Sequence, residues 1–146
     1  MGHRSKLWIY LTMLIAAAGV VIHIGAVFGG ASWFEFFRAP PRFSTSAREG
    51  TWLAPVAALV IAALMGSCGY YAASALKLVP RPPLQRPGLA VMAGACLIRA
   101  LLLPLLGTTH PELWNTFEVV AALIWGCAGI GLAVAFSCTG NRANPG

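Results

Sequence analysis

The side chains that could carry chemistry are few in this sequence, and the three most informative lie inside long apolar stretches. Arg99 stands in the middle of GACLIRALLLPLL, residues 94–106, and His23 and Glu118 fall in two other apolar stretches. An ionisable group within a membrane span is costly, and it normally faces a bundle interior, a water-filled cavity or an ionic partner. We therefore treat His23, Arg99 and Glu118 as candidate binding residues of a polar interior.

Glu118 is the obvious partner of Arg99, because it is the acidic residue that falls inside an apolar stretch. Depth argues against a direct pair, since Glu118 lies near the outer end of its expected helix, ~7 Å above Arg99 at 1.5 Å per residue. Helical side chains also lean toward the N-terminus of their helix, so these two would diverge. A direct pair remains open, because the arginine side chain is long. The alternative partners of Arg99 are the hydroxyls of Tyr70 and Tyr71, and backbone carbonyls freed near Pro104.

His23 shares one helical face with small or mildly polar residues, at spacings of i, i+4, i+7 and i+11. These residues are Thr12, Ala16 and Gly19. His23 can act as a proton-relay or ligand-binding histidine, or it can be a neutral histidine bonded to a neighbouring helix. Haem ligation is disfavoured, because His3 and His110 lie outside the apolar stretches. The four cysteines form no C-x-x-C pair and no metal-ligand spacing with histidine, so we expect no metal and no cofactor.

Catalytic motifs are scarce in this sequence. It contains no aspartate, and none of the G-x-S-x-G, H-E-x-x-H, P-loop or G-x-G-x-x-G patterns. Glu35 and Glu49 fall in one connection and could form an acid–base site with His23, but their spacing alone gives this little weight. We therefore expect a non-enzymatic protein.

The elements that position these residues follow from composition. Hydrophobic residues make up 58% of the 146 residues and charged residues only 10%, whereas soluble domains have about 25% charged residues. Four apolar runs reach the ~20 residues that a membrane-spanning helix needs. They are Leu7–Phe28, Trp52–Leu76, Leu89–Leu106 and Phe117–Phe136. The sequence predicts an all-α polytopic membrane protein, an antiparallel four-helix transmembrane bundle that forms a single domain over residues 1–146.

Lysine and arginine set the expected orientation. The N-terminal tail, the connection between the second and third runs, and the C-terminal tail carry six of them, and the first connection carries three. The six are Arg4, Lys6, Lys77, Arg81, Arg86 and Arg142, and the three are Arg38, Arg42 and Arg48. This asymmetry predicts cytoplasmic N- and C-termini. It also assigns the net charge of +6 to topology and the lipid bilayer, with no nucleic-acid partner.

The two long connections differ in character. In the first, residues 29–51, aromatic residues favour the level of the lipid headgroups. We expect Ser32–Phe37 to form a short interfacial helix or turn on the outer face, ended by the prolines that follow. Its interfacial residues are Trp33, Glu35, Phe37 and Arg38. The second connection, LVPRPPLQRPG at residues 78–88, is expected to be an extended, stiff spacer.

Small residues recur at helical spacing in the second and fourth runs, and they allow helix backbones to approach closely in lipid. They are Ala58, Ala62, Gly66, Ala122, Gly126, Gly129 and Ala133. These small residues could serve helix packing within one bundle. Alternatively, they could form the interface of a homo-oligomer or of a complex with another membrane protein.

The chain resembles a family of small four-helix bacterial inner-membrane proteins of unknown function. The shared pattern reads G-x-x-x-W-F-x-F-F-x-A-P-P at residues 29–41, then Gly50, Pro55, YAxS at 71–74, PLxR at 83–86 and Arg99. The chain departs from it around Cys96, where an aromatic residue is usual, and after Ser74, where glycines are. The resemblance implies a fold and a membrane location but no reaction. A fainter similarity to DoxX-like proteins rests on architecture alone.

Three functions remain open from the sequence. The first is a non-enzymatic accessory or assembly protein, or a protein that binds a small or lipidic ligand. The second is a small transporter or proton-coupled subunit that uses His23, Arg99 and Glu118. The third is a membrane enzyme acting on a lipid or quinone at the outer face.

Overall fold

The computed structural model describes residues 1–111 and 114–140, so Arg142, which enters the topology count, lies outside the described residues. Five helices and no strand form in the described ranges: α1 (His3–Phe36), α2 (Pro41–Arg48), α3 (Leu53–Ala75), α4 (Gln85–Leu106) and α5 (Thr116–Gly140). The prediction of an all-α protein is confirmed. The bounds shift mainly at α1, which begins four residues early and runs on past Phe28, and at α4, which begins four residues before Leu89.

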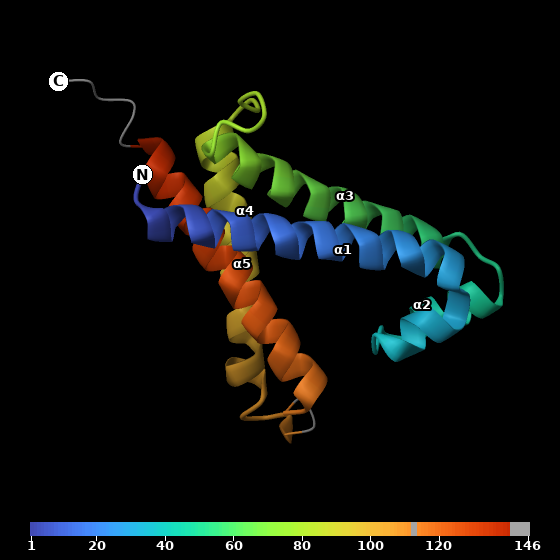
Figure 1. Ribbon diagram of the computed structural model, residues 1–146. Coiled ribbons are helices and arrows are strands. Elements are labelled where there is room, and N and C mark those ends of the chain that lie inside the picture. The colour runs from blue at the N-terminus through green and yellow to red at the C-terminus, as the bar shows by residue number, and fades with distance from the viewer. Residues whose placement is uncertain (112–113, 141–146) are drawn as a thin grey trace. The chain divides into compact units, whose positions relative to one another are not determined.

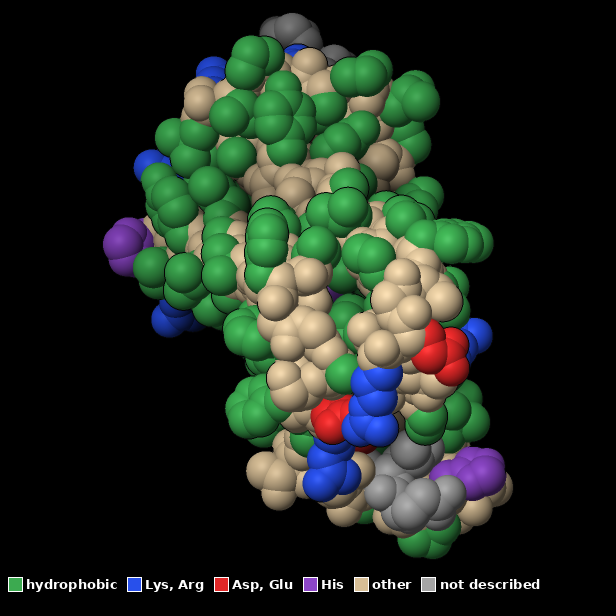
Figure 2. All heavy atoms as spheres, turned by 90° about the vertical axis from the view of Figure 1, so that its right-hand side faces the viewer, with side chains coloured by type: hydrophobic (Ala, Val, Ile, Leu, Met, Phe, Trp, Pro, Cys, Tyr) green, Lys and Arg blue, Asp and Glu red, His purple; other side chains and the backbone are tan. Residues whose placement is uncertain are grey.

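Four of these helices, α1, α3, α4 and α5, are long and apolar enough to cross a membrane. Large hydrophobic side chains stay exposed along them, such as Leu14, Leu64, Leu101 and Leu123. Figure 2 shows hydrophobic side chains over much of the visible surface. Such a surface is stable in lipid and not in water, so the chain is a multi-pass membrane protein.

The chain divides into two compact units, and α1 and α3 each contribute to both. Unit 1 consists of Met1–Ile15 and Cys68–Gly146, and unit 2 consists of Ala16–Ser67. Each unit is described by itself below.

Unit 1 packs parts of all four membrane-length helices around one small-residue core. Its buried members are Ile9, Ala72, Ala75, Leu89, Ala93, Cys96, Ala128, Leu132 and Ala135. The helices approach closely because glycines stand at the contacts. At Gly131 of α5 an added Cβ would collide with the Thr12 hydroxyl and would lie 2.6 Å from the Trp8 carbonyl oxygen. The Thr12 hydroxyl also lies 3.4 Å from the Ala128 carbonyl oxygen, so α1 crosses α5 in close contact at this point.

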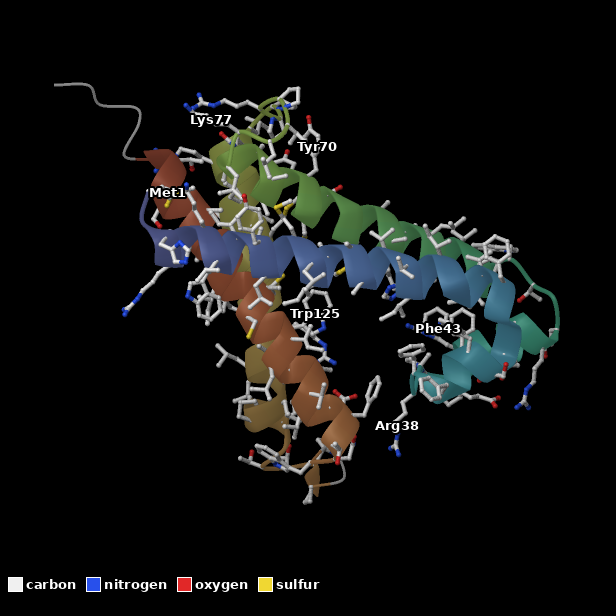
Figure 3. All side chains as sticks on the ribbon, viewed as in Figure 1. Met1, Arg38, Phe43, Tyr70, Lys77 and Trp125 are labelled. Carbon is white, nitrogen blue, oxygen red and sulfur yellow. The ribbon has the colours of Figure 1, made fainter. Side chains whose placement is uncertain are left out.

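The connection between α3 and α4 is held onto the end of α3. The Tyr70 hydroxyl donates to the Pro80 carbonyl at 3.2 Å, and the Tyr71 hydroxyl donates to the Pro83 carbonyl at 3.0 Å. Figure 3 shows Tyr70 beside this connection. Residues 79–82 have no regular structure, and Leu84 has a left-handed φ of 53° just before α4. The expected extended spacer is therefore shorter than predicted, because α4 includes residues 85–88.

In unit 2, α1 and α3 lie side by side and antiparallel (Figure 1). An added Cβ at Gly19 would lie 3.0 Å from the Met65 sulfur, and one at Gly66 would lie 3.7 Å from Val20. Ala16, Ala58 and Ala62 are buried in the same unit. The small residues of the second run therefore serve contacts within this chain.

The short helix or turn expected at Ser32–Phe37 forms, because α1 is divided by a kink and the helical segment beyond the kink ends at Phe36. Gly30 makes the kink, with φ 63° and ψ −155°, a conformation open to glycine and costly for other residues. Beyond it the chain turns back, and the Trp33 indole nitrogen donates to the Ile22 carbonyl at 3.1 Å. The Trp33 ring covers Gly25, where an added Cβ would lie 2.8 Å from it.

Helix α2, which the sequence reading treats as loop, begins with Pro41 in its first turn, where proline is well tolerated. It ends at Arg48 with Glu49 as its C-cap. Gly50 follows with a φ of 67°, and the Thr51 amide donates to the Ser46 carbonyl at 2.9 Å. That bond and the left-handed glycine define a Schellman ending. The buried Ser46 hydroxyl then accepts the Ala54 amide at 3.0 Å and so caps the start of α3.

Candidate functional site

Arg99 and Glu118 form an ion pair in unit 1. Arg99 Nη2 donates to Glu118 Oε2 at 3.1 Å, and the exposed fractions of the two side chains are 38% and 25%. Glu118 stands in the first turn of α5, and its amide donates to Asn115 Oδ1 at 3.1 Å. A carboxylate in the first turn is favoured by the helix dipole, so α5 itself holds this acceptor in place.

The pair forms although its members start at different levels. An added Cβ at Gly126 would lie 3.7 Å from Ala100, so these residues face each other across α4 and α5. Glu118 lies eight residues from Gly126 along α5, about 12 Å at 1.5 Å per residue. The long Arg99 side chain and the Glu118 side chain together cover that separation. The direct pair, which the sequence leaves open, therefore forms.

Two of the alternative partners of Arg99 are engaged elsewhere, because the Tyr70 and Tyr71 hydroxyls donate to the proline carbonyls of the α3–α4 connection. The ion pair thus joins α4 to α5 directly. In lipid, such a pair holds two helices together and leaves neither charge alone.

His23 belongs to unit 2, whereas Arg99 and Glu118 belong to unit 1. Its Nδ1 donates to the Gly19 carbonyl of its own helix at 2.7 Å. The three residues proposed as an acid–base site have other contacts as well. Glu35 pairs with Arg48, and Glu49 is the exposed C-cap residue of α2.

A pocket of about 170 Å³ lies within unit 2 between α1, α2 and α3. Its lining side chains are apolar except for Thr51, and backbone polar atoms are also exposed in its walls: Ala26, Val27, Gly30, Phe34, Ala47, Gly50, Thr51, Ala54 and Pro55. A cavity of about 150 Å³ with apolar walls accommodates benzene, so this pocket has room for a short stretch of hydrocarbon. We call it the unit 2 pocket.

One aromatic ring lines this pocket, and it leads through a ring contact to an arginine of α2. The Phe34 ring, which lines it, stacks on Phe43 of α2 with centroids 6.4 Å apart and planes tilted by 20°. The Arg42 guanidinium lies over the Phe43 ring, 4.8 Å from its centroid. Arg38 extends away from the helices of unit 2 (Figure 3). Phe37, another of the predicted interfacial residues, contacts the Trp33 ring, and the two ring centroids are 5.5 Å apart.

The ion pair between Glu35 and Arg48, here called the rim pair, joins α1 to α2 beside the pocket. Glu35 follows the lining residue Phe34, and Arg48 follows the lining residue Ala47. Sequence reasoning missed this arrangement because it read residues 38–51 as loop. The usable signal is the spacing of Phe43, Ser46 and Ala47, which places one helical face toward the interior.

The described residues offer little to a metal. No group of three or more His, Cys, Asp or Glu side chains there is placed to hold a metal ion. All four cysteines are free thiols, and buried side-chain polar atoms in the described ranges have hydrogen-bond partners.

Comparison of the chain with models of protein families, with curated proteins and with solved structures gives no match. The resemblance carried by the motif at residues 29–41 therefore stays a prediction.

Proposed function

We propose that this protein is a non-enzymatic, lipid-binding accessory protein of a bacterial plasma membrane, with both termini in the cytoplasm. The observation that carries the proposal is the unit 2 pocket, whose apolar walls and volume suit part of an acyl chain. A multi-pass protein meets such chains at a very high local concentration in the bilayer. The orientation rests on the lysine and arginine count.

The charged interior supports this function over transport. A transporter that used Arg99 and Glu118 would present them to a cargo, but here each charge satisfies the other at 3.1 Å. His23 donates to a carbonyl of its own helix. These contacts favour helix cohesion as the role of the intramembrane polar groups.

The test is lipid retention after purification in a mild detergent, measured by native mass spectrometry. Ala47→Phe places an aromatic ring in a pocket of about benzene size, and we expect this variant to lose most of the retained lipid. The matched control is Ala63→Phe, because Ala63 is exposed on α3 of the same unit. Equal retention by wild type and both variants would contradict the proposal.

A further inference from the structure

The rim pair joins the two helices next to the unit 2 pocket, although neither of its members lines the pocket itself. Glu35 follows the lining residue Phe34 of α1, and Arg48 follows the lining residue Ala47 of α2. Both side chains are open to solvent, with exposed fractions of 47% for Glu35 and 67% for Arg48. An ion pair this exposed is weak and exchanges readily with other ions.

The charge near the pocket favours an anion. Residues 29–51 carry three arginines and two glutamates, which leaves one net positive charge. Among the described residues there are two ion pairs, Arg48 with Glu35 and Arg99 with Glu118. Of the three arginines in residues 29–51, Arg48 is therefore the one that is paired with a carboxylate. Arg42 is held over the Phe43 ring at 4.8 Å, which leaves the edge of its guanidinium group open to an anion.

We propose that the unit 2 pocket takes an acyl chain of an anionic phospholipid, and that the phosphate of this lipid displaces Glu35 from Arg48. This inference rests on the proposed function and names its ligand class. One amphiphilic molecule matches both features, because its hydrocarbon fits the pocket and its phosphate fits the arginines. Guanidinium groups bind phosphate oxygens through paired hydrogen bonds, and a lipid with one net negative charge neutralises the segment.

Glu35 acts as an internal competitor in this arrangement. Without lipid it occupies Arg48, and with lipid it is released to solvent. Removal of its charge should therefore strengthen lipid binding, whereas removal of the Arg48 charge should weaken it. A purely structural rim pair would predict a loss in both variants, so the opposite signs identify the competition.

The experiment uses the full-length protein in nanodiscs that contain phosphatidylglycerol and phosphatidylcholine in equal amounts. The ratio of the two lipids retained on release is measured by native mass spectrometry for wild type, Glu35→Gln, Arg48→Gln and Arg81→Gln. Arg81→Gln is the control, since it removes an exposed arginine from the α3–α4 connection. Wild type should prefer phosphatidylglycerol, and one arginine near the headgroups should change that preference about fivefold.

We expect Arg48→Gln to lower the preference about fivefold, Glu35→Gln to raise it, and Arg81→Gln to leave it unchanged. An equal fall in Arg48→Gln and Arg81→Gln would overturn the inference, because it would reflect total charge only. A fall in Glu35→Gln would overturn it as well. If wild type retained both lipids equally and Ala47→Phe released both, the ligand class would be wrong and the proposed function would stand. Retention unaffected by Ala47→Phe would reject the proposed function itself.

Discussion

Removal of Glu118 should destabilise the protein more than removal of the whole ion pair. Glu118→Leu leaves Arg99 without its partner at 3.1 Å, inside a helix long and apolar enough to span the membrane. Arg99→Leu leaves the carboxylate, but Glu118 stays in the first turn of α5, where the helix dipole and its capped amide support it. The double variant Arg99→Leu/Glu118→Leu leaves no charge to solvate.

The distances and exposures set the magnitude. At 3.1 Å, and with an effective dielectric constant of about 20, the direct attraction is about 5 kcal/mol before desolvation is subtracted. Breaking a buried pair from one side costs about 3–5 kcal/mol, and the partial exposure of both side chains places this pair below that range. We expect Glu118→Leu to lower the free energy of unfolding by about 2–3 kcal/mol, and the double variant to stay within about 1 kcal/mol of wild type.

The assay is a double-mutant cycle on the free energy of unfolding in mixed micelles, with circular dichroism of the helices as the readout. Arg38→Leu is the control, because Arg38 is exposed in unit 2 and forms none of the ion pairs among described residues. It should change the free energy of unfolding by less than about 0.5 kcal/mol. A double variant as unstable as the sum of the single variants would refute the reasoning.

Two further predictions concern close packing and capping. Gly131→Ala should cost about 1–3 kcal/mol in thermal or denaturant unfolding, because the new methyl group collides with Thr12. Gly126→Ala is its control in the same helix, since the methyl group there meets Ala100 at 3.7 Å, and similar losses in both variants would contradict the packing argument. Ser46→Ala should cost about 1–2 kcal/mol, because the Ala54 amide loses its acceptor. Ser44→Ala removes an exposed hydroxyl bonded to Pro41 and should be neutral, so a cost as large as that of Ser46→Ala would count against the capping role.

The four long helices could be predicted from local sequence, because each needs only an unbroken apolar stretch of membrane length. The shorter elements could not. Helix α2 depends on Ser46, whose hydroxyl accepts the Ala54 amide at the start of α3. It also depends on Gly50, whose left-handed φ lets the Thr51 amide reach the Ser46 carbonyl. Trp33 is an ordinary interfacial residue in the sequence, and its contact with Gly25 arises only because Gly30 reverses the chain.

The sequence alone identified Arg99, Glu118 and His23 as costly polar groups in spans, since charge and hydropathy are properties of the residues themselves. Tertiary structure decided what each contacts. Arg99 reaches Glu118 because α4 and α5 pack antiparallel and arginine is long enough to cover the offset between them. The unit 2 pocket forms where three helices meet, since Phe34 of α1, Ala47 of α2 and Ala54 of α3 all line it. The rim pair likewise depends on the contact between α1 and α2. Such contacts join residues far apart in the chain, so no local pattern encodes them.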